Sequence, residues 1–198
     1  MAGVTKELVK ELREKTGAGM NDCMRALKEN NGDIKKSIEY LREKGIASAE
    51  KKSARSANEG LIHSYIHANG KVGTMVELNC ETDFVARTED FEVLARDIAM
   101  QVAAMTPLYV KREDVPSELI EKEKEIYRAQ LAEQKKPEKV IDKIVTGKLE
   151  KYYREICLVE QTFIKDDKMN IETLVKEKIS KLGENIVIKR FVRFALGE

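Results

Sequence analysis

One stretch of the chain places the strongest constraint on its fold. An alternating run of apolar and polar residues extends from Leu61 to Asn79, and it is interrupted by Asn69-Gly70, the preferred pair of a type I′ hairpin turn. A helical pattern of apolar residues follows from Phe91 to Met105. The sequence therefore predicts an antiparallel hairpin, with strands at 61–67 and 72–80, and a long helix at 89–105 that covers one of its faces.

Between the hairpin and the helix, residues 80–87 read CETDFVAR. Thr82 is a good N-cap residue, since its hydroxyl can accept a hydrogen bond from the amide of Phe84 or Val85. The resulting turn would point Asp83 and Phe84 outward together. A carboxylate beside a phenyl ring at such a corner suits insertion into another protein. The alternative is that Phe84 fills the chain's own core, which composition alone favours.

The rest of the chain is predicted to be mostly helical. Apolar stripes separated by Gly17-Ala18-Gly19 and by Asn31-Gly32 indicate a three-helix N-terminal bundle at 1–46, whose last helix ends at Gly45. A polar linker at 47–59, with room for some helix, leads to an α+β core at 60–198. This core contains the hairpin and long helix, a helical hairpin arm at 116–156 with a break at Pro137, a helix at 171–182 and a C-terminal strand at 185–196 that completes a small three-stranded antiparallel sheet.

The charge balance does not indicate a nucleic-acid or membrane partner. In 198 residues, 36 Lys and Arg face 35 Asp and Glu, and the net charge is +1. Three cysteines without a CxxC spacing favour reduced thiols in a cytosolic protein. No apolar run approaches the roughly 20 residues of a membrane span, and no signal peptide opens the chain. We therefore expect a soluble, cytoplasmic protein.

Motifs for catalysis and cofactor binding are absent from the sequence. It contains no GxxxxGK[ST], HExxH or GxSxG pattern and no Cys/His cluster. Its two histidines, His63 and His67, lie four residues apart on one predicted strand, about 13 Å from each other, too far to share a metal ion. We expect no cofactor, no metal and no enzyme activity, so the function should lie in binding a partner.

Three separated segments resemble the elongation factor Ts family. They are ELNCETDFVA at 77–86, TGAGM at 16–20 and KLGENIVI at 181–188, and they occur in the family's order over almost the whole chain. That family exchanges guanine nucleotide on elongation factor Tu in bacteria and organelles. The chain shows a single hairpin of the 61–80 kind and so resembles the short form, with one core module.

The resemblance implies a docking surface in the N-terminal bundle. Family members carry a ubiquitin-associated-type bundle there, and the loop before its second helix is the usual binding surface. Asn21 stands where members often have a second Met, so the apolar patch is smaller. The residues to which this surface is assigned in the bundle and linker are Lys10, Arg13, Gly19, Met20 and Lys52.

The resemblance also implies a mechanism. Asp83 and Phe84, with Thr82 and Val85 beside them, would intrude next to the Mg²⁺ and phosphate region of Tu, in its GDP-bound and nucleotide-free states. Two other functions remain open: an adaptor that docks proteins without changing their nucleotide state, and an RNA-binding accessory factor of translation. The small sheet has unpaired edges and apolar residues on both faces, which predicts a homodimer through the sheet and terminal strand.

Overall fold

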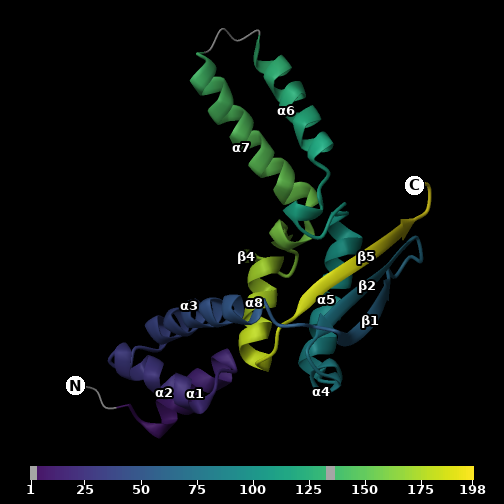
Figure 1. Ribbon diagram of the computed structural model, residues 1–198. Coiled ribbons are helices and arrows are strands. Elements are labelled where there is room, and N and C mark those ends of the chain that lie inside the picture. The colour runs from purple at the N-terminus through teal and green to yellow at the C-terminus, as the bar shows by residue number, and fades with distance from the viewer. Residues whose placement is uncertain (1–3, 133–136) are drawn as a thin grey trace. The chain divides into compact units, whose positions relative to one another are not determined.

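The computed structural model describes residues 4–132 and 137–198 of the chain. Helices are combined with a three-stranded antiparallel sheet (Figure 1), which confirms the predicted α+β class. The chain divides into two compact units. One is formed by Met1–Leu61, Leu78–Leu94 and Thr173–Val187, and the other by Ile62–Glu77, Ala95–Glu172 and Ile188–Glu198.

Three helices form the predicted N-terminal bundle: α1 (Lys6–Thr16), α2 (Met20–Glu29) and α3 (Ile34–Lys52). The Thr5 hydroxyl caps α1 and the Asp33 carboxylate caps α3, and each accepts a hydrogen bond from a backbone amide. The three helices share their own apolar core, whose fully or nearly fully buried members are Val9, Leu12, Cys23, Ala26 and Leu27.

Helix α3 does not end at Gly45, so that prediction was wrong. The helix continues to Lys52 and takes in the first part of the segment expected to be a linker. Gly45 is buried within it, and a Cβ atom at this position would lie 2.9 Å from the Ser180 hydroxyl. The glycine therefore allows close approach of another helix rather than termination of its own.

The sheet has the order β1–β2–β5, with strands β1 (Glu59–Ile66), β2 (Val72–Cys80) and β5 (Val187–Ala195). The C-terminal strand completes the sheet, as predicted, and it lies beside β2. The hairpin turn is not type I′, because Gly70 has a positive φ (68°) and Asn69 does not. Instead the Gly70 amide donates to the His67 carbonyl, and the Asn69 side chain accepts from the Lys71 amide.

Helix α5 (Glu89–Met105) has the predicted bounds. The side chains of Phe91, Leu94, Ile98 and Val102 on its apolar face are fully buried, as are Val76 and Leu78 of β2. The Thr74 hydroxyl of β2 also donates a hydrogen bond, at 3.0 Å, to the carbonyl of Ala99 in the second half of α5. One face of the sheet is therefore covered by this helix.

The helical arm consists of α6 (Ser117–Ala132) and α7 (Glu138–Ile156), and Figure 1 shows the two helices side by side. They share a core of buried Ile120, Leu131, Val145 and Leu149. Pro137 directly precedes α7, in agreement with the predicted break, and residues 133–136 lie outside the described residues. At the base of the arm, Arg112 pairs with Glu150 and Glu160 and lies over the Tyr153 ring.

A short hairpin that the sequence analysis missed precedes helix α8 (Ile171–Leu182). Its strands are β3 (Thr162–Phe163) and β4 (Asp166–Asn170). The buried Gln101 side chain of α5 donates to the Thr162 carbonyl and accepts from the Ile164 amide, so it fixes this hairpin on α5. Among the described helices, none is both long and apolar enough to cross a membrane.

Candidate functional site

Residues 82–86, which we call the Thr82 turn, form the predicted capped turn. Thr82 has extended backbone angles, and its hydroxyl accepts a hydrogen bond from the Val85 amide at 3.5 Å, at the start of the four-residue helix α4 (Asp83–Ala86). Ala86 is buried, whereas Phe84 is 79% exposed. This exposure excludes the alternative in which Phe84 fills the chain's own core.

The exposed ring of Phe84 is an apolar surface that the chain itself leaves unburied. Burial of a phenyl side chain is worth roughly 1.5–3 kcal/mol, and this ring does not gain that free energy within the chain. Asp83 lies next to it at the N-terminus of α4, and its carboxylate forms a 2.8 Å ion pair with Arg87 one turn later. The turn therefore presents an apolar ring beside a carboxylate that is already paired and about half exposed.

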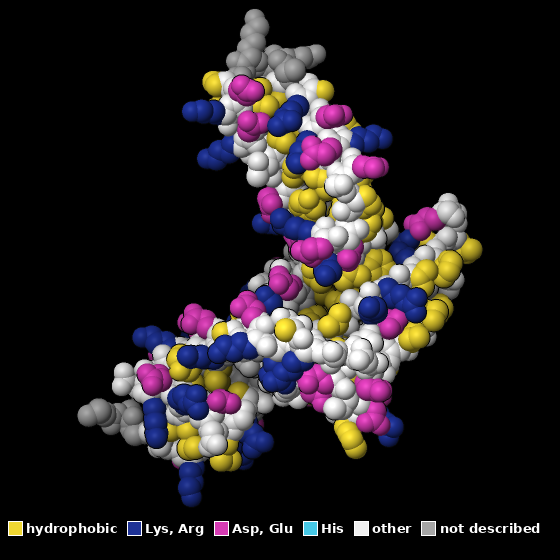
Figure 2. All heavy atoms as spheres, in the orientation of Figure 1, with side chains coloured by type: hydrophobic (Ala, Val, Ile, Leu, Met, Phe, Trp, Pro, Cys, Tyr) yellow, Lys and Arg dark blue, Asp and Glu magenta, His cyan; other side chains and the backbone are white. Residues whose placement is uncertain are grey.

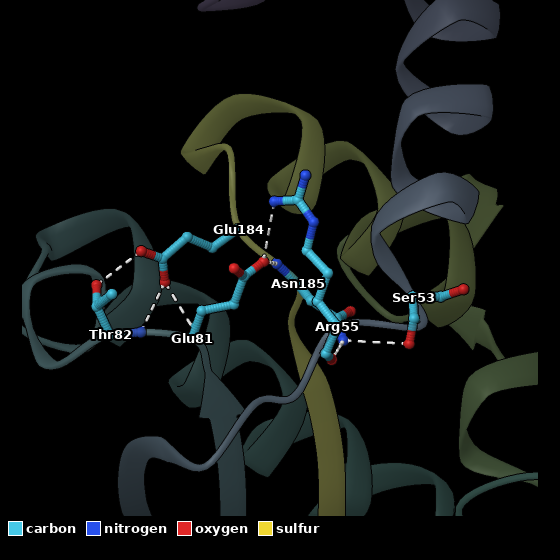
Figure 3. Close-up of polar contacts among 6 residues, drawn as sticks. All are labelled: Ser53, Arg55, Glu81, Thr82, Glu184 and Asn185. Carbon is cyan, nitrogen blue, oxygen red and sulfur yellow. Dashed lines mark hydrogen bonds and ion pairs between the residues drawn. The ribbon is translucent and has the colours of Figure 1, made fainter.

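The Thr82 turn is held from outside by Glu184, which follows helix α8 and Gly183. The Glu184 Oε2 atom accepts the amides of Glu81 and Thr82, at 3.1 and 3.0 Å, and Oε1 accepts the Thr82 hydroxyl at 2.7 Å (Figure 3). The adjacent Asn185 amide donates in turn to the Glu81 carboxylate at 2.7 Å. Two segments about a hundred residues apart in sequence thus exchange hydrogen bonds in both directions.

Sequence reasoning missed these contacts. Glu184 and Asn185 lie in the 181–188 segment that carried the family resemblance, but no role was assigned to them. Asn185 is almost fully buried, and its side chain donates to the carbonyls of Arg55 and Ser53, directly after α3. The signal available in the sequence was a Gly-Glu-Asn triplet after a helix, and its partners could not be deduced from spacing.

The residues assigned to the N-terminal docking surface are distributed over α1, α2 and α3. Lys10 and Arg13 are exposed on α1, and Met20, the first residue of α2, is 56% exposed. Gly19, the N-cap of α2, and Lys52 line one cleft of the first unit, whose wall does not include the other three. The structure therefore brings together only part of this set.

The described residues offer little for covalent or metal chemistry. Within 4–132 and 137–198, no group of three or more His, Cys, Asp or Glu side chains is arranged to hold a metal ion. His67 contacts the Tyr65 hydroxyl at 3.1 Å, and both of these side chains lie on the hairpin. All three cysteines are free and buried.

The protein has an α+β fold, and its candidate site is an exposed Phe84 on a turn held by hydrogen bonds to Glu184. These features define a class of protein whose candidate site is a contact surface. The sequence matches the family described as Elongation factor TS over residues 3–198. The chain belongs to that family, which confirms the resemblance and assigns it to the translation elongation factors.

Individual relatives agree with this assignment over nearly their whole length. The chain is 59% identical to elongation factor Ts of Carboxydothermus hydrogenoformans over 195 residues, which cover 98% of this chain and 90% of that protein. It is 60% identical to the protein of the same name from Moorella thermoacetica, covering 96% and 94%. With that of Thermosipho melanesiensis it shares 60% identity, covering 98% and 100%.

Proposed function

We propose that this protein is a guanine-nucleotide exchange factor that binds elongation factor Tu–GDP in the cytoplasm. In this proposal the Asp83-Phe84 pair is inserted near the Mg²⁺ and phosphate site of the partner, GDP leaves, and GTP binds again. The protein acts by binding, and it needs no cofactor and no metal of its own. The observation that carries the proposal is the 79% exposure of Phe84 on a capped turn, in a chain of the Ts family.

Exchange of this kind follows from a coupling of two binding equilibria. A factor that binds nucleotide-free Tu more tightly than Tu–GDP must weaken GDP binding by the same coupling free energy. No bond is made or broken. A phenyl ring placed between the elements that hold the metal's ligands would move them apart, and a carboxylate nearby would perturb the electrostatics of the ion. Thr82 and Val85 supply the backbone that orients both side chains.

The N-terminal bundle is the second contact in this proposal, as a ubiquitin-associated-like docking module. Met20 is its exposed apolar residue, and Lys10 and Arg13 supply positive charge on α1. Gly19 and Lys52 line the adjacent cleft. Contacts of this kind would lower the concentration of factor needed for exchange without themselves displacing nucleotide.

The protein is also proposed to form a homodimer through the open face of its sheet. The support comes from six exposed apolar side chains of the second unit: Ile62, Ile66, Met75, Val192, Phe194 and Leu196. Figure 2 shows hydrophobic side chains gathered along this part of the sheet. A second copy is a suitable partner because a two-fold axis would bring the same apolar side chains together from both chains.

The release of GDP from purified Tu tests the proposed function. Phe84→Ala should slow stimulated release by about 30-fold or more, because removing a central aromatic contact costs about 2–4 kcal/mol. The melting temperature of the variant should stay near the wild-type value, because the ring is mostly in water. A variant that exchanges normally would contradict the insertion of Phe84. If the wild-type protein binds Tu without releasing GDP, the adaptor function is favoured instead.

A further inference from the structure

The carboxylate of Glu184 stabilises the Thr82 turn at three atoms. It accepts hydrogen bonds from two consecutive backbone amides, those of Glu81 and Thr82, and from the Thr82 hydroxyl. Hydrogen bonds to an ionised acceptor are shorter and stronger than neutral ones. Figure 3 shows that the Glu184 side chain reaches across from the end of α8 to the start of the turn.

The contact with the Thr82 hydroxyl also orients the helix cap. A hydroxyl has a single proton, and in Thr82 this proton is directed to Glu184 at 2.7 Å. The oxygen lone pairs are then available to the Val85 amide, which donates to the same oxygen. A helix of four residues cannot sustain itself, so the conformation of α4 depends on this cap and on the contacts around it.

Glu184 is itself fixed from the opposite side. Gly183 before it has a left-handed backbone (φ 84°), and Asn185 after it is 2% exposed. The Asn185 side chain donates to the Arg55 carbonyl at 2.7 Å and to the Ser53 carbonyl at 3.3 Å. The support for the Thr82 turn therefore comes from a rigid segment that is joined to the end of α3.

We propose that Glu184 is a positioning residue for nucleotide exchange: it holds the Thr82 turn in the conformation that presents Phe84 to the partner. This inference rests on the proposed function, since it assigns Glu184 a role that acts through Phe84. A turn that is fixed before binding does not lose conformational freedom on binding. If the turn samples other conformations, the apparent affinity falls by the fraction of molecules in the competent one.

A double-mutant cycle with Phe84 tests the inference. Glu184→Ala removes the carboxylate that accepts all three hydrogen bonds, and we expect stimulated GDP release at sub-saturating factor to fall about tenfold. In the Phe84→Ala background the same change should alter release by less than about twofold, because the ring that Glu184 positions is gone. A residue that only stabilised the fold would lower release equally in both backgrounds, and that result would overturn the inference.

Two substitutions at the same position separate acceptor geometry from fold stability. Glu184→Gln keeps the length of the side chain and an acceptor for the two amides, so release should stay within about threefold of wild type. Glu184→Asp is one methylene shorter and cannot reach all three donors, so release should fall about fivefold. A wild-type rate for Glu184→Asp overturns the inference, and this variant decides the matter if Glu184→Ala does not fold.

A second readout follows the turn itself in the full chain without Tu. Amide hydrogen exchange at Thr82 and Val85 should accelerate at least about tenfold in Glu184→Ala and by less than about threefold in Glu184→Gln, which keeps an acceptor for the two amides but not for the Thr82 hydroxyl, while the amides of α5 keep their protection. Glu121→Ala, which removes an exposed carboxylate of the arm that pairs with Lys124, is the matched control and should change neither readout. An unchanged rate of hydrogen exchange at the Thr82 amide in Glu184→Ala would contradict the positioning role. If instead Phe84→Ala alone leaves GDP release unchanged, the proposed insertion of Phe84 fails, and the two failures are distinguishable.

Discussion

At the scale of single residues, Asp83 and Phe84 are adjacent but should contribute unequally to exchange. The Asp83 carboxylate is paired with Arg87 at 2.8 Å; the Arg87 side chain is largely exposed and that of Asp83 is 45% exposed. An exposed charge is typically worth about 1 kcal/mol or less, since water can replace its partner. Asp83→Ala should therefore slow stimulated GDP release by no more than about fivefold, measured beside Phe84→Ala. Arg87→Ala is the control for the loss of the ion pair. If Asp83→Ala slows GDP release as much as Phe84→Ala does, the carboxylate is buried in the complex.

The three thiols should be nearly inert in the folded protein. Burial raises the pKa of Cys80 and of Cys157 to about 11, and nearby carboxylates, Glu184 and Glu160, add to the rise. Since the thiolate is the reactive form, Cys80 and Cys157 should each react with a disulfide reagent at pH 8 at least about 100-fold more slowly in buffer than in urea. Equal rates in the two solvents would contradict this burial.

The same shifts have a consequence for alkaline stability. A thiol whose folded-state pKa is raised stabilises the fold fully below its ordinary value of 9.0, and this contribution is lost as the pH rises towards 11. The free energy of unfolding should therefore fall between about pH 9 and pH 11. Replacement of Cys80 and Cys157 by Ala should reduce that decline.

The sequence predicted the local geometry of the candidate site but not its support. Thr82 as a cap followed from residue types and spacing, because capping is an effect within four positions. The outward position of Phe84 rested on the family resemblance, since composition alone favoured a buried ring. Glu184 could not be found in this way. Its partners are more than a hundred positions away, and only the folded chain brings them together.

At the scale of elements, Asp90 at the start of α5 connects this helix to α8. Its carboxylate accepts from the ammonium groups of Lys178 and Lys181, both at 2.8 Å, and these bonds lower its pKa below the ordinary value of 3.8. A carboxylate whose folded-state pKa is lowered stabilises the protein at pH values above its ordinary pKa of 3.8. This contribution disappears as the pH falls through the lowered pKa.

Asp90→Asn tests this connection. The variant should lose up to about 1 kcal/mol of unfolding free energy at pH 7, a small effect because the charges are partly solvated. The difference from wild type in urea denaturation should shrink as the pH is lowered to 3, and it should also shrink at high salt. A difference that stays constant with pH would indicate lost packing rather than lost charge.

Element types were more predictable than their ends. Helix α5, the two arm helices and α8 follow apolar stripes at helical spacing, so their bounds agree with the prediction closely. The end of α3 was missed because a glycine that packs against another helix looks the same in sequence as one that ends a helix. Gly45 is of the first kind, since it lies against Ser180. The β3–β4 hairpin was missed because its strands are short and polar and depend on Gln101 for their position.

At the scale of the whole molecule, the open face of the sheet leads to a prediction about assembly. Among the described strands, the order β1–β2–β5 leaves both β1 and β5 with an unpaired edge, and α5 covers one face. On the other face Ile66, Phe194 and Leu196 are each more than two-thirds exposed. Exposed apolar patches of this kind mark interaction surfaces more often than free surface. We therefore expect the wild-type protein to be a dimer by light scattering at micromolar concentration.

Phe194→Glu is the variant that should separate the two copies. In a two-fold interface each substitution occurs twice, so two carboxylates would be buried facing an apolar surface, which is far costlier than the loss of one contact. The variant should be monomeric at concentrations where the wild type is dimeric, and its melting temperature should lose its dependence on protein concentration. Because Phe194 is 69% exposed within one chain, the monomer should still fold. Leu108→Glu, an exposed apolar position outside the sheet, is the matched control and should remain dimeric. A wild-type protein that scatters as a monomer, or a Phe194→Glu dimer of unchanged strength, would mean that this face is not the interface between copies.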